Sequence, residues 1–229
     1  MSKSSKRMAV NRESLDSNQH YSLDEAISLL KKTSNAKFNE TIDIAINLGI
    51  DAKKSDQNVR GSMVLPNGTG KTLRVIVFAQ SEQVDAAKNA GADKVGFEDL
   101  AEEIKSGFSE FDVVIATPDT TRIVGQLGKI LGPKGMMPNP KDGTVTKNVE
   151  DAVIKAKTGQ IRFRNDKGGV VHCPIGKIDF SEESIKENLE SLLDAIMKSK
   201  PSSAKGAFIK KVTVSSTMGP GITIDHSTI

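Results

Sequence analysis

The chain has 229 residues, enough for one large domain or two of ordinary size, and 37% of them are hydrophobic. Aromatic residues make up only 4%, so the core must be built from aliphatic side chains. The formal net charge of +3 permits an anionic partner but does not require one.

Several classes of protein are excluded at this stage. Cys173 is the only cysteine, so no intrachain disulfide can form. No run of apolar residues approaches the ~18 that a membrane-spanning helix needs. The basic first residues are not followed by an apolar stretch, as a secretory signal would require. We therefore expect a cytoplasmic protein without a membrane partner.

The first part of the chain combines a helix with strands. Ser22 and Glu25 have the spacing of a capping box, which predicts a helix that ends near Lys32. Isoleucine and leucine recur at every second position over residues 42–50, as in a strand with one buried face. A second strand is expected over residues 59–66, so this part predicts an antiparallel sheet with one wet face.

The middle of the chain alternates between strands and helices. Two continuous apolar runs, LRVIVFA and FDVVIA, are typical of strands that are buried on both faces, and a short strand is expected at 94–97. Helices are expected from Ser81, over 98–106, from the Thr117–Pro118 pair toward Leu131, and from Asn148 to Gly159. This order predicts a parallel, doubly wound α/β unit.

The last part of the chain returns to the pattern of the first. It predicts hairpin strands over 159–166 and 168–180, a helix over 181–199, and two strands around a Gly/Pro turn over 207–224. Each flank alone would have a marginal core. We therefore predict one α+β domain built from both chain ends, residues 1–67 and 160–229, with an α/β domain of residues 68–159 inserted between them.

Charge divides the chain in the same way. Residues 1–72 carry 11 Lys and Arg against 8 Asp and Glu, and residues 160–229 carry 10 against 8, so the flanks together have a net charge of +5. Residues 73–159 carry 11 against 13, a net charge of −2. An anionic partner is therefore expected to bind the flanks.

The stretch LPNGTGKTLRV raises the question of a nucleotide-binding enzyme, because Gly70-Lys71-Thr72 matches the second half of a phosphate-binding loop. The first glycine of that loop would fall at position 65, which holds leucine. A strand follows where the loop requires a helix N-terminus. We interpret the stretch as a turn between domains, and a nucleotide-using α/β enzyme is the alternative.

No other pattern indicates catalysis or metal binding. The dinucleotide-binding pattern G-x-G-x-x-G is absent from the α/β unit. His20, His172 and His226 are scattered without the spacing of metal ligands, and no helix-turn-helix pattern of a transcription regulator occurs. We predict no catalytic residues, no metal and no cofactor.

Three polar segments on the basic flanks are candidates for RNA binding: residues 35–41, 162–177 and 215–222. Structured RNA is recognised by mixtures of basic, hydroxyl and apolar groups, and such mixtures occur here. Phe38 and Met218 are large apolar side chains within these polar stretches. The alternative, equally compatible with the local pattern, is that both side chains fill the core.

A fourth segment, residues 124–145, is rich in glycine and proline. A long irregular loop on a compact domain is usually functional or mobile. The alternative is a rigid connection in which Met136 and Met137 pack on the domain.

Five stretches together closely resemble the bacterial ribosomal protein L-one family, the first protein of the large ribosomal subunit. They are GKILGPKGMMPNPKDGTV, FRNDKGGVVHCPIGK, AKFNET, SDQNVRG and STMGPGI. The resemblance implies a non-enzymatic protein whose inserted α/β domain is Rossmann-like and three-layered. It implies binding to the mobile stalk of large-subunit ribosomal RNA beside the exit site, contact with deacylated tRNA there, and repression of its own operon through the messenger RNA. The free protein is expected to be a monomer.

The resemblance also implies which residues carry these roles. The RNA-binding residues of the family correspond here to Lys37, Phe38, Glu40, Thr41, Arg164, Asp166, Lys167, His172, Thr217, Met218 and Gly219. The hinges between the domains correspond to Gly68, Gly70, Lys71 and Gly159.

Overall fold

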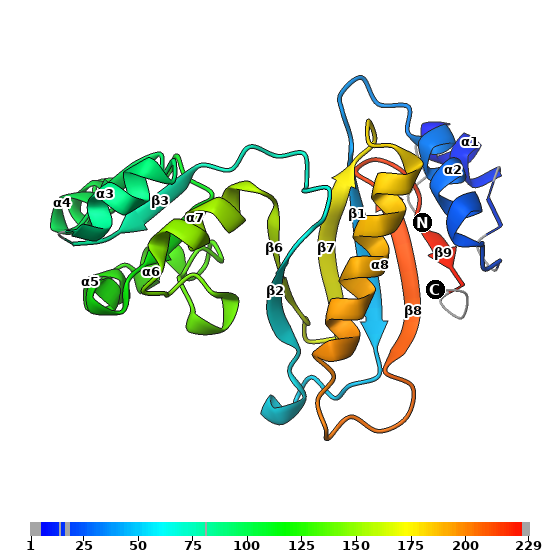
Figure 1. Cartoon of the computed structure of the whole chain (residues 1–229). Coiled ribbons are helices and arrows are strands. Elements are labelled where there is room, and N and C mark those ends of the chain that lie inside the picture. Colours follow the sequence, from blue (N-terminus) through cyan, green and yellow to red (C-terminus); the bar gives the residue numbers. More distant parts are fainter. Residues whose placement is uncertain (1–5, 14, 17–18, 81, 226–229) are drawn as a thin grey trace. The chain divides into compact units, whose positions relative to one another are not determined.

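A computed structural model describes residues 6–13, 15–16, 19–80 and 82–225 of the chain (Figure 1). The chain divides into two compact units. The terminal unit consists of Met1–Gly70 and Ile161–Ile229, and the inserted unit consists of Lys71–Gln160. Both units combine helices with sheets, which confirms the predicted fold class. Among the described helices, none is long and apolar enough to cross a lipid bilayer.

A four-stranded antiparallel sheet in the order β7-β1-β8-β9 forms the centre of the terminal unit. Its strands are β1 (Thr41–Leu48), β7 (Val170–Lys177), β8 (Ile209–Ser216) and β9 (Ile222–Ile224). Strand β1 comes from the first flank of the chain, and both of its neighbours come from the second flank. The first flank therefore cannot complete its sheet without the second.

Two helices, α2 (Leu23–Thr33) and α8 (Glu182–Lys198), pack on the sheet in one continuous core (Figure 1). The predicted capping box of Ser22 and Glu25 begins α2, and Ser181 caps α8. The alternation in β1 is confirmed, because its isoleucine and leucine residues are buried and Asp43 and Asn47 are exposed. A short first helix, α1 (Lys6–Glu13), precedes α2.

A second, two-stranded sheet pairs β2 (Arg60–Val64) with β6 (Gln160–Arg164), and η1 (Ser55–Gln57) precedes β2. This corrects the expectation that β6 forms a hairpin with β7. Strand β6 pairs with β2 instead, and an isolated bridge, Asn165–Val171, forms where the chain passes from β6 to β7. Asn165, the residue after β6, is hydrogen-bonded to the first flank, because its Oδ1 accepts from the Val59 N–H (2.8 Å). That bond holds the end of β6 to the first flank, and β7 pairs with β1 instead.

The inserted unit contains a parallel sheet in the order β4-β3-β5. Alternate residues of the sheet belong to two core clusters, one shared with α4 and the other with α3 and α7. The sheet is therefore covered on both faces, as the continuous apolar runs predicted. Ser81, the expected start of the first helix, lies outside the described residues. The elements are β3 (Val75–Phe78), α3 (Glu82–Asn89), β4 (Lys94–Gly96), α4 (Glu98–Lys105), β5 (Val113–Ala116) and α7 (Val149–Lys157).

The helix expected between Thr117 and Leu131 is divided into three short pieces, η2 (Pro118–Thr120), α5 (Thr121–Gln126) and α6 (Gly128–Leu131). Glycine within this stretch weakens a continuous helix. The loop that follows contains η3 (Pro140–Asp142). Met136 and Met137 pack, half-buried, against the core of the unit, so the packed alternative is correct for these two side chains.

Candidate nucleic-acid interface

The start of β1 is the place where two of the predicted binding segments meet. The Thr41 N–H donates to Thr217 Oγ1 (3.0 Å), and the Thr217 N–H donates to the Thr41 carbonyl (3.0 Å). The Ile178 N–H donates to the Glu40 carbonyl (3.0 Å), which adds the segment after β7. The dipeptide Glu40–Thr41 therefore joins three parts of the chain.

The side chain of Glu40 lies inside this junction, because the residue is only 2% exposed. Its Oε1 accepts a hydrogen bond from the Ala36 N–H (3.1 Å), and its Oε2 accepts one from the Met218 N–H (2.9 Å). Burial raises the pKa of Glu40, but the hydrogen-bonding groups around it, the Met218 N–H, the Ser216 hydroxyl and the Ala36 N–H, outweigh burial, and with the nearby Arg7 guanidinium they hold the pKa below its ordinary value. The carboxylate is therefore ionised at neutral pH.

Phe38 and Met218 belong to the segments that Glu40 holds, and both side chains are exposed, by 54% and 44%. Neither fills the core, so that alternative is wrong. Lys37 is also exposed. The turn after β8 is tight, because a Cβ atom on Gly219 would lie 2.5 Å from Ser216 Oγ. We call residues 36–41 together with residues 216–219 the Glu40 corner.

Sequence reasoning missed two contacts that support this corner. Arg7 Nη2 donates to the Met218 carbonyl (3.4 Å), and the Asn39 amide donates to the Asp179 carboxylate. The partners are separated by 211 and 140 positions in the sequence, so no local pattern could reveal them.

The second group of predicted residues surrounds a turn, Asp166–Val170, which we call the Asp166 turn. Asp166 Oδ1 accepts hydrogen bonds from the N–H groups of Val170 and Gly168 (2.8 Å each). The Val170 hydrogen bond is the main reason that the pKa of Asp166 lies below its ordinary value. His172 Nε2 lies 3.8 Å from Asp166 Oδ2. The side chains of Lys167 and of Arg164, before the turn, are exposed cations.

The structure does not bring the two groups together. Thr41 is opposite Lys177 and Asn47 is opposite Val170, so the groups lie at opposite ends of β1 and β7. Six residues of strand correspond to about 20 Å. An open strip of sheet lies between the groups and includes Ala45, which is opposite exposed His172. A single ligand can contact both groups only if it is extended or large.

The glycines at the predicted hinges share an unusual backbone conformation. Gly68, Gly70 and Gly159 have φ values of 66°, 69° and 107°, a region that favours glycine. The buried Asn188 side chain of α8 holds the first of these segments, since it accepts from the Asn67 N–H (3.0 Å) and donates to the Gly68 carbonyl (3.0 Å). The units divide two residues after Gly68 and one residue after Gly159.

The neighbouring stretch is not a phosphate-binding loop. Leu65, at the position of the first loop glycine, is 1% exposed and packs in the core of the terminal unit. The next element after the exposed Lys71 is strand β3, not a helix. The interpretation of this stretch as a turn is therefore correct.

Comparison with known proteins now assigns the family. Residues 30–220 match the model of the ribosomal protein L1p/L10e family. The chain belongs to this family. Two relatives are each named large ribosomal subunit protein uL1, one from Vibrio vulnificus at 61% identity and one from Tolumonas auensis at 60%. Each comparison spans 229 residues, which is 100% of this chain and 98% of the relative.

Members of this family of ribosomal proteins are structural proteins, so the chain is not an enzyme, as the sequence predicted. The single thiol of the chain is not a reactive one. Cys173 is buried, and burial raises the pKa of its thiol to about 12, which leaves almost no thiolate at neutral pH. Within the described ranges, no three His, Cys, Asp or Glu side chains gather where they could hold a metal ion.

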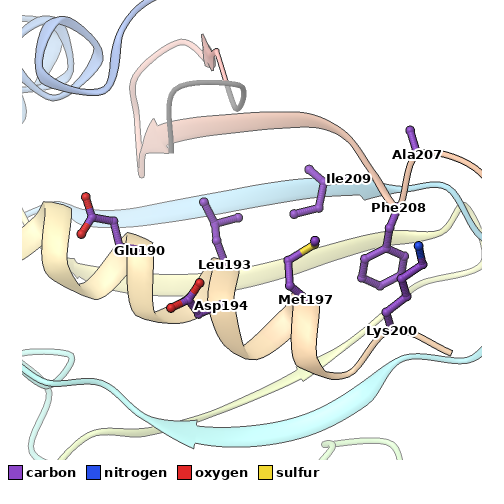
Figure 2. Close-up of a pocket in the computed structure, with 8 residues that line it drawn as sticks. All are labelled: Glu190, Leu193, Asp194, Met197, Lys200, Ala207, Phe208 and Ile209. Atoms are coloured by element: carbon purple, nitrogen blue, oxygen red, sulfur yellow. The ribbon is translucent and has the colours of Figure 1, made fainter.

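A pocket of about 490 Å³ lies elsewhere in this ribosomal protein, between the C-terminal half of α8 and the start of β8 (Figure 2). Its apolar lining comes from Leu193, Met197, Ala207, Phe208 and Ile209, and its charged lining comes from Glu190, Asp194 and Lys200. None of the predicted RNA-binding residues lines it. The pocket is therefore not part of the candidate interface.

Proposed function

We propose that this ribosomal protein is a component of the large subunit that binds the mobile stalk of large-subunit ribosomal RNA beside the exit site. The observation that carries the proposal is the Glu40 corner, where Phe38 and Met218 are exposed on a hydrogen-bonded support. Such a surface can pack on ribose or bases while its rigid backbone and nearby cations fix the phosphates. The names of the relatives support the large subunit as the location, and hence a cytoplasmic, ribosomal protein.

The size of the candidate interface favours a folded RNA as the ligand. The Glu40 corner and the Asp166 turn are about 20 Å apart, and each carries exposed cations that can contact phosphates. A folded RNA stalk can cover the open sheet between them. A nucleotide or another small ligand cannot reach both groups.

The proposal assigns RNA binding to the terminal unit. The terminal unit carries 20 Lys and Arg against 16 Asp and Glu, a net charge of +4, whereas the inserted unit carries 12 against 13, a net charge of −1. The inserted unit would then change position through the hinges at Gly68, Gly70, Lys71 and Gly159 when the stalk moves. A chain that joins residues 1–70 to residues 161–229 should retain the affinity for the stalk RNA. Strong, specific binding by residues 71–160 alone would refute this assignment.

The finer parts of the proposal come from the family resemblance. The stalk would contact deacylated tRNA at the exit site and assist its release. A messenger RNA segment from the protein's own operon, folded like the ribosomal site, would bind the same surface and so repress translation. One surface cannot hold both RNAs at once, so a monomer should bind one or the other.

The decisive experiment is a binding measurement with purified protein and the stalk RNA, with an unrelated RNA helix of equal length as the control. We expect specific binding whose affinity falls as salt rises. The operon leader RNA should compete for the same protein molecules. Equal affinity for the stalk and the unrelated helix would refute the proposed function, and simultaneous binding of stalk and leader would refute the repression mechanism.

A further inference from the structure

We propose that Glu40 is a positioning residue for RNA recognition. Its carboxylate fixes the loop that carries Lys37 and Phe38 against the turn that carries Met218, and the RNA contacts those side chains instead of the carboxylate. The inference rests on the proposed function, because it explains how the same surface becomes selective.

The use of both carboxylate oxygens supports this role. Oε1 is bound by the Ala36 N–H and Oε2 by the Met218 N–H, and the residue is 2% exposed. Little of the side chain is therefore open to a ligand. An accessible carboxylate would also repel the phosphates of RNA, whereas this one is enclosed and lies near the Arg7 guanidinium.

The geometry also explains why the position requires a carboxylate. Two N–H groups from distant segments face the two oxygens, and an ionised acceptor forms stronger hydrogen bonds than a neutral one. Glutamine has one acceptor oxygen, so its NH₂ group would face one of the N–H donors. Aspartate keeps the charge but is one methylene shorter, so it cannot reach both donors from the same backbone position.

The two possible roles of the Glu40 charge predict opposite changes in RNA affinity when the residue is replaced by a neutral one. Glu40→Gln raises the net charge of the protein by one, so simple attraction to RNA predicts equal or tighter binding. A positioning role predicts weaker binding, because the loop and the turn lose their common support. The sign of the change therefore separates the two explanations.

The test uses the full-length protein and three variants: Glu40→Gln, Glu40→Asp and the control Glu190→Gln. Glu190 is an exposed residue of α8, so its substitution reproduces the charge change away from the corner. We would measure stalk-RNA affinity over a range of salt concentrations, and hydrogen exchange of the Ala36 and Met218 amides in the free protein. Both Glu40 variants should lose affinity by roughly tenfold or more, with an unchanged salt slope and faster exchange at both amides. Glu190→Gln should leave the salt slope and the exchange of both amides unchanged and should raise the RNA affinity slightly.

Two results would overturn the inference. Unchanged RNA affinity in both Glu40 variants would show that the corner needs no such support. A loss of affinity with unchanged amide exchange would show that the RNA contacts the carboxylate itself. Failure of the unaltered protein to bind the stalk RNA would refute the proposed function instead, and the exchange measurement, which needs no RNA, keeps the two failures distinct.

Discussion

The Glu40 corner and the Asp166 turn use the same chemistry, but they join residues at different separations along the sequence. In each, one carboxylate accepts hydrogen bonds from two backbone N–H groups, and its pKa is lowered. Asp166 binds groups two and four residues further along the chain. Glu40 binds one group four residues away and one 178 residues away, and it is buried.

This difference in sequence separation determines how much of the fold each carboxylate stabilises. The Asp166 turn is local, so a short segment can form it with little help from the rest of the protein. The Glu40 corner exists only when both ends of the chain have folded together, and its donors have less access to water. Loss of the Glu40 carboxylate should therefore affect the whole terminal unit, and loss of Asp166 should affect one loop.

The largest expected effect is on stability. Glu40→Ala should lower the free energy of unfolding by about 2 kcal/mol, since it leaves two N–H groups without their acceptor. Asp166→Ala should lower it by less, because water can replace the exposed carboxylate. Urea unfolding of both variants checks this order. A greater loss for Asp166→Ala would contradict the proposed difference between the two regions.

The next effect concerns RNA affinity. Met218→Ala should weaken binding of the stalk RNA by about 1–2 kcal/mol with little change in melting temperature, because the side chain is 44% exposed. Met197→Ala, at a methionine of α8 that is 51% exposed, is the matched control and should leave affinity unchanged. Binding and melting are measured on the same preparations. A lower melting temperature with intact affinity would show that Met218 supports the fold instead.

A smaller effect should appear in the pH dependence of stability. The pKa of Glu40 is lowered in the folded protein, so its ionised form contributes stability that is present above the ordinary value of 4.5 and is lost as the pH falls through the folded pKa. The difference in unfolding free energy between the unaltered protein and Glu40→Gln should be constant above that value and shrink below it. Urea unfolding from about pH 6 to about pH 3 measures it. A difference that grows on acidification would contradict the assigned charge state.

The smallest effect should be seen in the salt dependence of binding. Lys37→Ala removes one exposed cation from the Glu40 corner, and Lys167→Ala removes one from the Asp166 turn. Each should flatten the slope of log affinity against log salt by about the amount that corresponds to one phosphate contact. Lys198→Ala, on α8, should leave the slope unchanged. If only the Lys37 variant changes the slope, the Asp166 turn does not contact phosphate, and the interface is confined to the corner.

Local signals in the sequence were sufficient for most of the fold. The capping residues Ser22, Asn148 and Ser181 begin helices where predicted, because a cap depends on residues within one turn. The continuous apolar runs gave strands β3 and β5, since burial on both faces leaves no alternation. The predicted hairpin of β6 with β7 was wrong because β6 pairs with β2, from the first flank; the nearby hydrogen bond between Val59 and Asn165 joins residues that are 106 positions apart.

The candidate site was less accessible to sequence reasoning. The exposure of Phe38 and Met218 could not be predicted from an apolar residue in a polar stretch, because the same pattern fits a core residue. The burial of Glu40 between two amides had no local signal at all. Its assignment as an RNA contact came from the family resemblance and stays a prediction that the Glu40 variants test.

The place of β1 at the centre of its sheet has a consequence for biosynthesis. Its first neighbour, β7, begins about 120 residues after β1 ends. Because translation adds about 5–20 residues per second, β1 has no partner strand on either edge for some seconds while the ribosome completes the chain. Unpaired strand edges invite association with other chains. The inserted unit, whose partners are close in sequence, can fold during this interval, while a nascent β1 must be kept apart from its copies on neighbouring ribosomes of the same messenger.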